Sequence, residues 1–280
     1  MPAPQPTLMK QAARLKFSSF GLTVPTDWKQ PQGEDGDHFN QAFKDNEKST
    51  TPSTAAPPLF RPASLNKYHT DAQKMHVAKF GEFIDGIVDA ICSAWDKWQS
   101  TASMTGIMVN AVTASVGQVI GIPWTPIILA QGPKSTPMQL KYTTAIANTL
   151  GPAWLTYTTA LKVPGLPWYP AFATFPSPVA PPTPNVPTPI ASLVQVQASL
   201  APPLLKNQMV GMLADPRAPF HKELFESVID AFDKMFKIWL TSTMVTNVLG
   251  AGAVPSMALP VPVPGPVVGG IASMPPGGFK

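Results

Sequence analysis

Few side chains in this 280-residue sequence have the types and spacing that chemistry requires. The four histidines form no H-E-x-x-H pair and have no cysteines at zinc-ligand spacing, so we expect them on the solvated surface. Cys92 is the single cysteine, which excludes an internal disulfide, and we interpret it as a small buried residue. Phosphate-binding glycine loops, nucleophile elbows and kinase motifs are absent from the sequence. The sequence therefore predicts neither an enzyme nor a bound cofactor or metal ion.

Two pairs of carboxylates have a spacing that could support acid–base chemistry. Asp85 with Asp89, and Glu226 with Asp230, lie four residues apart and would share one face of a helix. Such pairs transfer protons or bind cations only in a suitable pocket, and on amphipathic helices they more often form the solvated face. Asp89 and Asp230 also fall at equivalent positions of an internal repeat. We therefore interpret them as structural, for example as caps on a neighbouring backbone.

Aromatic residues form the more informative set of side chains. They recur at matched places beside proline-rich segments, and the docking of proline ribbons on aromatic grooves is a known mode of protein recognition. Ordinary core packing is the simpler explanation for such rings. We nevertheless predict an interaction surface, on which each ring-bearing helix face covers a proline ribbon of its own chain or of a neighbour. The residues of this predicted surface are Trp95, Trp98, Trp124, Trp154, Tyr157, Trp168, Tyr169, Phe236 and Trp239.

Three similar helical segments would position these rings. In each segment apolar residues recur at intervals of three and four, which is the spacing of one helix face. Trp98 of the first copy corresponds to Tyr157 of the second and Trp239 of the third, and the first and third copies align without a gap. In the second copy we expect Gly151 and Pro152 to kink or break the helix. A true triplication would give one chain pseudo-threefold symmetry, suited to a three- or six-fold axis; chance similarity among aromatic amphipathic helices is the alternative.

An uncharged, proline-containing segment follows each of these helices. Because a proline cannot donate to the hydrogen-bond ladder of a sheet, we expect extended polyproline-like ribbons here rather than central strands. The predicted fold class is therefore mainly α, with three amphipathic helical units joined by extended Pro/Gly-rich segments and with low strand content. The predicted divisions of the chain are an extended N-terminal arm at 1–63 and three helical repeats with their tails at 64–133, 134–205 and 206–280.

Charge is scarce and unevenly distributed along the chain. Charged residues make up 13% of it, against about 25% in typical soluble domains, and the net charge is +4. Residues 101–200 contain three lysines and no acidic residue, so no basic stripe supports nucleic-acid binding. The N-terminus has no apolar run after a basic stretch, which predicts cytoplasmic synthesis without a signal peptide. The best candidate for a membrane-spanning helix, 105–122, contains too many polar residues and glycines.

Two proline-rich runs carry a family resemblance. The run WYPAFATFPSPVAPPTPNVPTPI at 168–190 and the ending PGPVVGG at 264–270 resemble structural proteins of phage tails and tail-like contractile injection systems. This resemblance implies a tail, baseplate or virion component and assigns no role to any residue.

The function predicted from the sequence is that of a structural subunit of a large protein assembly, incorporated into a virion or a tail-like particle. Its uncharged Pro-rich segments would be buried against neighbouring chains. The expected partners are other protein subunits, including copies of itself, and not nucleic acid. The alternative is a membrane-active protein that inserts or forms pores. Unpaired extended backbone is costly in hydrocarbon, which favours burial against protein.

Overall fold

The computed structural model describes residues 3–22, 62–257 and 263–280, with side chains from residue 75 onward in the second range. The chain divides into two compact units, one made of Met1–Phe17 with Phe83–Lys280 and the other of Ser18–Glu82. Helix α4 (Pro62–Thr101) contributes residues to both units. All the described strands and the other long helices belong to the larger unit.

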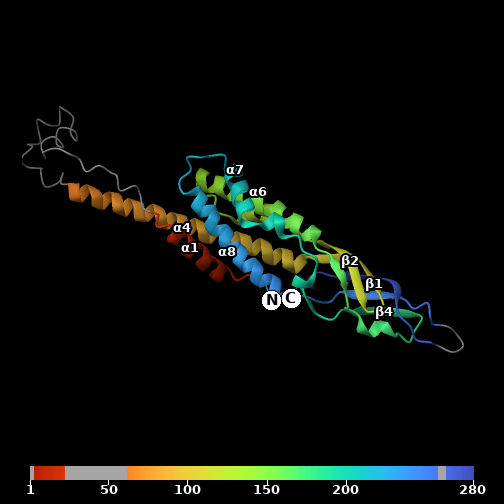
Figure 1. The fold of residues 1–280 in the computed structure, drawn as a ribbon. Helices are drawn as coiled ribbons and strands as arrows, with labels where there is room; N and C mark the ends of the chain where they lie inside the picture. The colour runs from red at the N-terminus through yellow and green to blue at the C-terminus, as the bar shows by residue number, and fades with distance from the viewer. Residues whose placement is uncertain (1–2, 23–61, 258–262) are drawn as a thin grey trace, which may run out of the picture. The chain divides into compact units, whose positions relative to one another are not determined.

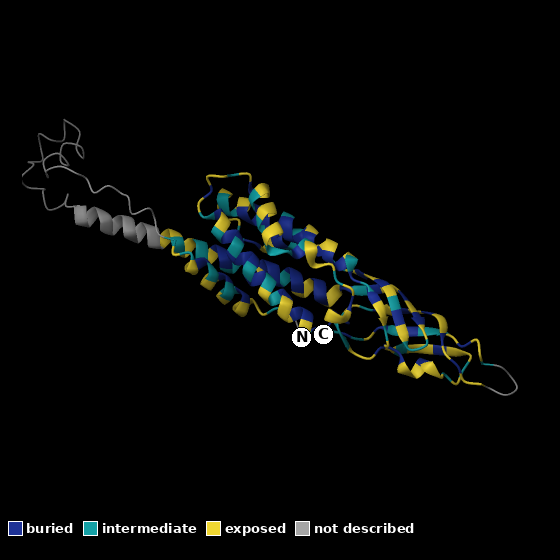
Figure 2. Ribbon diagram, viewed as in Figure 1, coloured by how far each residue is buried: buried dark blue, intermediate teal, exposed yellow. Residues whose placement is uncertain are grey.

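Three long helices form the centre of the larger unit (Figure 1). They are the C-terminal half of α4, α6 (Pro137–Ala160) and α8 (His221–Ser242). Helix α6 begins with a cap, because the Thr136 side chain accepts a hydrogen bond from the backbone N–H of Gln139. The apolar stripes of the three helices face one another, as the buried residues along their inner sides show (Figure 2).

The three long helices run in the same direction. Near the N-terminal ends of α6 and α8 and the middle of α4, the ring of Tyr142 in α6 lies 5.7 Å from Phe83 in α4 and 5.8 Å from Phe225 in α8. Further along, the ring of Trp154 in α6 lies 5.0 Å from that of Trp95 in α4. The helices therefore meet in the register that the sequence repeat predicts.

Three shorter helices return against the long ones. They are α1 (Pro6–Ser19), α5 (Trp124–Gln131) and α7 (Pro202–Leu213). Each begins at a proline or directly after one, where the missing N–H costs the helix no internal hydrogen bond. The short helices therefore give every long helix a preceding antiparallel partner in the chain.

Each short helix fills the groove between two long helices. Helix α5 packs on α6, and its Trp124 ring lies 5.5 Å from Trp95 of α4. Helix α7 packs on both α6 and α8. Helix α1 contacts both α4 and α8. Lys10 pairs with Asp89 of α4 at 2.7 Å, and Lys16 pairs with Glu226 of α8 at 3.0 Å.

The prediction of an extended N-terminal arm at 1–63 was wrong for the part occupied by α1. Its buried residues Met9, Ala13 and Phe17 recur at intervals of four, the spacing of one helix face, and this face packs into the core. Residues 23–61 of the predicted arm lie outside the described residues.

A six-stranded antiparallel sheet lies beyond the C-terminal ends of the long helices, with strand order β3-β2-β1-β8-β7-β4 (Figure 1). A second, two-stranded sheet pairs β5 with β6. The strands are β1 (Ser103–Asn110), β2 (Thr113–Ile120), β3 (Val163–Leu166), β4 (Val179–Pro184), β5 (Thr188–Pro189), β6 (Met244–Val245), β7 (Leu249–Ala253) and β8 (Val268–Met274). The short 3-10 helices are η3 (Pro170–Ala173), η4 (Ile190–Ser192) and η5 (Gln197–Leu200).

The predicted fold class, mainly α with low strand content, was wrong. The structure is 53% helix and 21% strand, which is a mixed α/β fold. The reason lies in where the prolines fall. The four inner strands β1, β2, β7 and β8 contain no proline, whereas Pro164 and the prolines of β4 lie on the two edge strands, where a missing donor does not interrupt the ladder.

In the six-stranded sheet, the pairing between copies follows the internal repeat in cyclic order, although β3 and β4 of the second copy do not pair with each other and leave the sheet open there. Among the strands of this sheet, β1 and β2 follow the first long helix, β3 and β4 the second, and β7 and β8 the third. In each copy the second strand pairs with the first strand of the next copy: β2 with β3, β4 with β7, and β8 with β1. This cyclic order would be an unexpected result of chance similarity between three helices, and it supports a true triplication.

One backbone conformation also recurs in all three copies. Gly106, Gly165 and Asn247 hold equivalent positions after their helices, and they have positive φ angles of 69°, 81° and 58°. Glycine and asparagine are the residues that tolerate this left-handed conformation best. The pairings of β1 with β8 and of β2 with β3 both shift register around this position, as expected for a β-bulge.

The predicted break at Gly151 and Pro152 does not occur, because α6 continues from Pro137 to Ala160 with Pro152 inside it. Gly151 has a packing role instead. A Cβ atom there would lie 2.0 Å from the Thr125 side-chain oxygen and 2.9 Å from its backbone nitrogen, so the glycine lets α5 approach α6 closely.

Candidate interaction surface

The predicted aromatic surface is the core of the chain. All nine of its residues are buried, none with more than 3% of its surface exposed. Trp95, Trp154 and Phe236 occupy equivalent positions in the three copies, and their ring centroids are 5.0, 6.1 and 6.3 Å apart. These three rings therefore join the copies at their centre. The rings that surround them in the same cluster are Trp98, Trp124, Tyr157 and Trp239.

The two remaining residues of the predicted surface lie in the sheet half of the unit. Tyr169 stacks on Phe172 at 5.1 Å, and its hydroxyl donates to the carbonyl of Val248 at 2.9 Å. Trp168 is 1% exposed. The structure thus brings seven of the predicted residues into one cluster and places the other two apart, and every one of them makes contacts within its own chain.

The carboxylates singled out by spacing form ion pairs. Asp85 pairs with Arg14 at 2.6 Å, and Asp230 pairs with Lys234 at 2.8 Å. Like Asp89, they are therefore held by basic side chains, and the predicted capping of a neighbouring backbone was not the role found. The hydrogen bond from Lys206 lowers the pKa of Glu226, so this carboxylate is not poised as an acid or base near neutral pH.

Cys92 is buried, as predicted, with its Sγ 3.7 Å from the sulfur of Met9. Burial, with the nearby Asp89 carboxylate, raises the pKa of the thiol to about 12, which makes it a poor nucleophile. The expectation of a solvated surface position was wrong for His221, which is buried with its Nδ1 2.7 Å from the carbonyl oxygen of Ala218. In the described ranges no group of His, Cys, Asp and Glu side chains could hold a metal ion.

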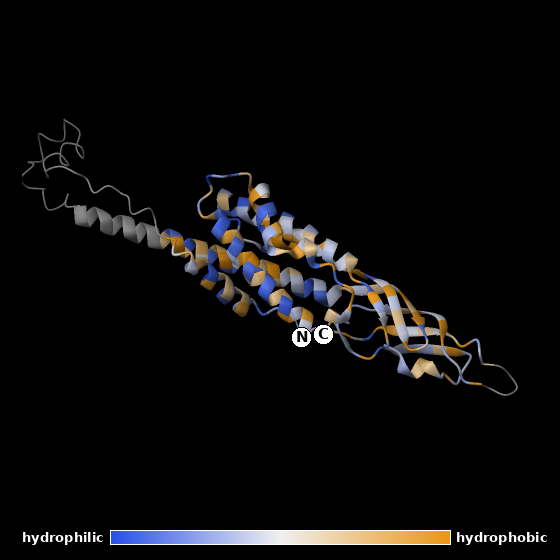
Figure 3. Cartoon of the chain, in the orientation of Figure 1, coloured by the Kyte–Doolittle hydropathy of each residue, from blue (hydrophilic) through white to orange (hydrophobic). Residues whose placement is uncertain are grey.

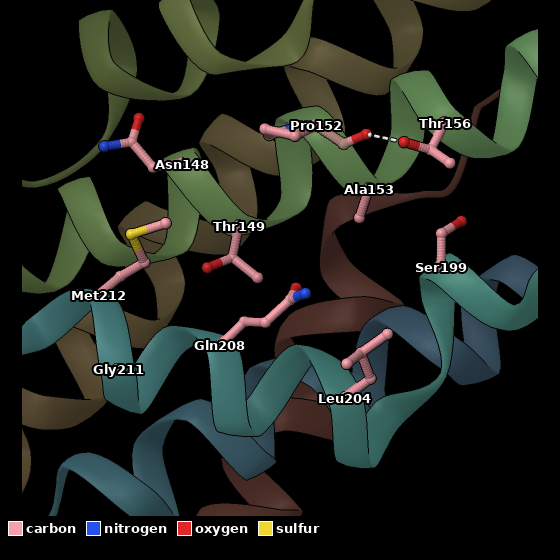
Figure 4. Close-up of a pocket in the computed structure, with 10 residues that line it drawn as sticks. All are labelled: Asn148, Thr149, Pro152, Ala153, Thr156, Ser199, Leu204, Gln208, Gly211 and Met212. Atoms are coloured by element: carbon pink, nitrogen blue, oxygen red, sulfur yellow. Dashed lines mark hydrogen bonds between the residues drawn. The ribbon is translucent and has the colours of Figure 1, made fainter.

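A groove of about 600 Å³ lies between α6 and α7 (Figure 4). Thr149 is 3% exposed and its Oγ1 has no hydrogen-bond partner, and the Thr156 hydroxyl donates to the carbonyl of Pro152 at 2.9 Å. No charged or titratable group lines the groove, so it offers hydrogen bonds and apolar contact but no acid, base or nucleophile pair. Its lining residues are Asn148, Thr149, Pro152, Ala153, Thr156, Ser199, Leu204, Gln208, Gly211 and Met212.

The exposed face of the six-stranded sheet is the unusual surface of this unit. None of its strands contains a charged residue. Met108 of β1 is 48% exposed and lies directly opposite Ile271 of β8, which is 74% exposed. Figure 3 shows the strands in white and orange, whereas blue residues are concentrated on the helices. Further large apolar residues at least half exposed in these strands are Val116, Ile120, Val179 and Val268.

Sequence reasoning found that these segments lack charge, but it did not find that they form a sheet with an exposed face. The structure adds the orientation, because Ile107 and Val109 are buried on either side of exposed Met108. The edges of the sheet are protected by prolines, which block the addition of further strands. A partner would therefore meet the face of the sheet or its turns.

No family model, no curated protein and no solved structure matches this chain. Among the described helices, none is both long enough and apolar enough to cross a bilayer.

Proposed function

We propose that this chain is a structural subunit of a large protein assembly, such as a virion or a phage-tail-like particle, and that it docks through the neutral face of its six-stranded sheet. The observation that carries the proposal is the exposed pair Met108 and Ile271 on a sheet without charge. Charged residues make up about 25% of a typical soluble domain, whereas the centres of protein interfaces are depleted of charge. Burial against neighbouring chains removes this apolar surface from water.

The groove and the carboxylates support a binding role over a catalytic one. The groove lacks titratable groups, and the carboxylates are engaged by lysine and arginine. The uncharged segments that the sequence singles out are the segments that build the sheet. The two runs that carry the resemblance to tail proteins contribute the exposed residues Val179 and Val268, whereas the Met108 and Ile271 pair lies outside them.

Substitution of single exposed residues tests the proposal. Met108→Lys places a charge on the sheet face, and Leu155→Lys places one on α6 at a residue with a similar exposure, 50% against 48%. When lysates of the native cells are separated by sedimentation, the Leu155→Lys chain should be found with the fast-sedimenting particles. The Met108→Lys chain should be found in the slow-sedimenting fraction of unassembled protein. Equal sedimentation of both variants with the particle would overturn the proposal.

A leakage assay separates the structural role from a membrane-active one. Purified chain added to dye-loaded vesicles should release no dye, because it has no spanning helix among its described residues and its extended segments are paired in sheets. Dye release by the monomeric chain would favour the membrane-active alternative.

A further inference from the structure

The three copies present equivalent neutral positions in the segments that follow their long helices. The segment after each long helix follows one pattern around the left-handed position: a buried residue lies two positions before it, an apolar residue directly follows it (buried in the first and third copies, half-buried in the second), and a more exposed position comes next. The outward residues are Met108, Pro167 and Leu249, of which the first two are exposed and the third is half-buried. All three are uncharged, so the sheet end repeats one neutral character around the pseudo-threefold axis.

The long helices do not repeat a common surface in this way. Asp96, Leu155 and Lys237 are exposed at equivalent positions of the three copies. They are an acid, an apolar residue and a base at one place in the repeat. A partner with three identical contact sites would meet three different charges there, and electrostatic complementarity could satisfy no more than one of them.

We infer that the neutral sheet end binds a closed protein ring with threefold symmetry, with one copy of this chain on the axis of each ring. This inference rests on the proposed function and adds the symmetry of the partner. A chain without internal symmetry on such an axis can meet only one ring subunit with a given surface, and the others are left unmatched. Three pseudo-equivalent sets of neutral residues can each contact one of three identical subunits. Because the three weak contacts are linked in one chain, binding is strengthened by avidity.

Site-specific photo-crosslinking in the intact chain tests the symmetry. A photoreactive phenylalanine analogue replaces Met108, Pro167 or Leu249, one at a time, in the native cells. The matched controls carry the analogue at Asp96, Leu155 or Lys237. We expect all three sheet positions to attach to the same partner polypeptide and to the same peptide within it, and we expect the helix positions not to share that peptide.

The outcomes separate this inference from the proposed function. Crosslinks from the three sheet positions to different polypeptides, or to a second copy of this chain, would overturn the ring while leaving a structural subunit in place. Crosslinks to lipid, without a fast-sedimenting particle, would overturn both. A composition of one chain to three or six partner subunits, measured by native mass spectrometry of the crosslinked complex, would support the ring, and one to one would refute it.

Discussion

Replacing Trp95 by alanine removes the side chain at the centre of the aromatic cluster. Trp95 is 0% exposed, and five other rings lie within 6.3 Å of its centroid. Truncation of a buried tryptophan to alanine costs about 3–5 kcal/mol through lost burial and the cavity left behind. The indole N–H has no hydrogen-bond partner within the described chain, so packing accounts for the cost. We therefore expect the free energy of unfolding to fall by about 4 kcal/mol.

Trp239→Ala should cost more than Trp95→Ala, although both rings belong to the same cluster. The Trp239 indole N–H donates to the side-chain oxygen of Gln99 at 2.9 Å, and Gln99 is 5% exposed. The truncation also removes this buried hydrogen bond, which adds about 0.5–1.5 kcal/mol. The order of the two variants thus separates the loss of packing from the loss of a hydrogen bond.

Urea unfolding followed by far-UV circular dichroism measures both losses. The expected loss is a large part of a total stability of about 5–15 kcal/mol, so a milder variant is needed that still folds. Trp95→Leu serves this purpose and should lower the free energy of unfolding by less than Trp95→Ala does. Leu155→Ala, at a half-exposed position, is the control and should change stability by less than about 0.5 kcal/mol. A loss below about 1 kcal/mol for Trp95→Ala, no larger than that of an average substitution, would refute a core built around this ring.

Further substitutions and one alkylation reaction test three single features of the fold. Gly165→Val should lower the free energy of unfolding by about 1–2 kcal/mol in thermal unfolding, because the φ angle of Gly165 is positive. Asn247→Gly should be neutral or slightly stabilising, because glycine adopts a positive φ freely. Equal effects of the two substitutions would argue against the shared backbone conformation. Cys92 should resist alkylation in the folded chain even at about pH 9, where an ordinary thiol with a pKa of about 8.5 reacts, because its pKa is raised to about 12. Glu226→Gln should cost no more than about 1 kcal/mol at neutral pH, since the carboxylate is partly exposed. Lys206 lowers the pKa of Glu226, so this contribution is present above the unfolded pKa and is lost as the pH falls through the lowered folded value. Unfolding of both chains across that range should show the difference disappear in acid, and a difference that persists there would point to another cause.

The helices of the core could be predicted from the sequence because their signals are local. The cap at Thr136 and the aromatic stripes follow from residue types a few positions apart, and the structure brings Trp95, Trp154 and Phe236 together at equivalent positions of the three stripes. Helix α1 escaped prediction although Met9, Ala13 and Phe17 carry the same spacing. Its stripe is short, and proline-rich segments flank it.

The sheet could not be predicted because its pairing depends on contacts far apart in the chain. Strand β1 pairs with β8, so Met108 meets Ile271 across a large part of the sequence. Small polar residues such as Thr105 and Ser115 also weaken the alternation of apolar and charged side chains that usually marks a strand. Prolines on the edge strands then made the whole segments look unsuitable for a sheet.

The candidate surface was misplaced for a related reason. Tryptophan and tyrosine are common both in cores and in interfaces, and the sequence does not show which kind of partner a ring meets. Here the rings meet one another, whereas aliphatic residues of the sheet meet solvent. The neutrality of the sheet is visible in the sequence, but the outward orientation of Met108 becomes visible only once its register is known.

The most direct test of the docking surface is the distribution of Met108→Lys chains between free and assembled fractions, measured against Leu155→Lys in the same cells. Both chains should fold, since both substitutions replace residues that are about half exposed. If the neutral sheet face is the contact with the assembly, Met108→Lys chains will remain in the free fraction while Leu155→Lys chains assemble. Assembly of the Met108→Lys chains at the wild-type level would contradict the account.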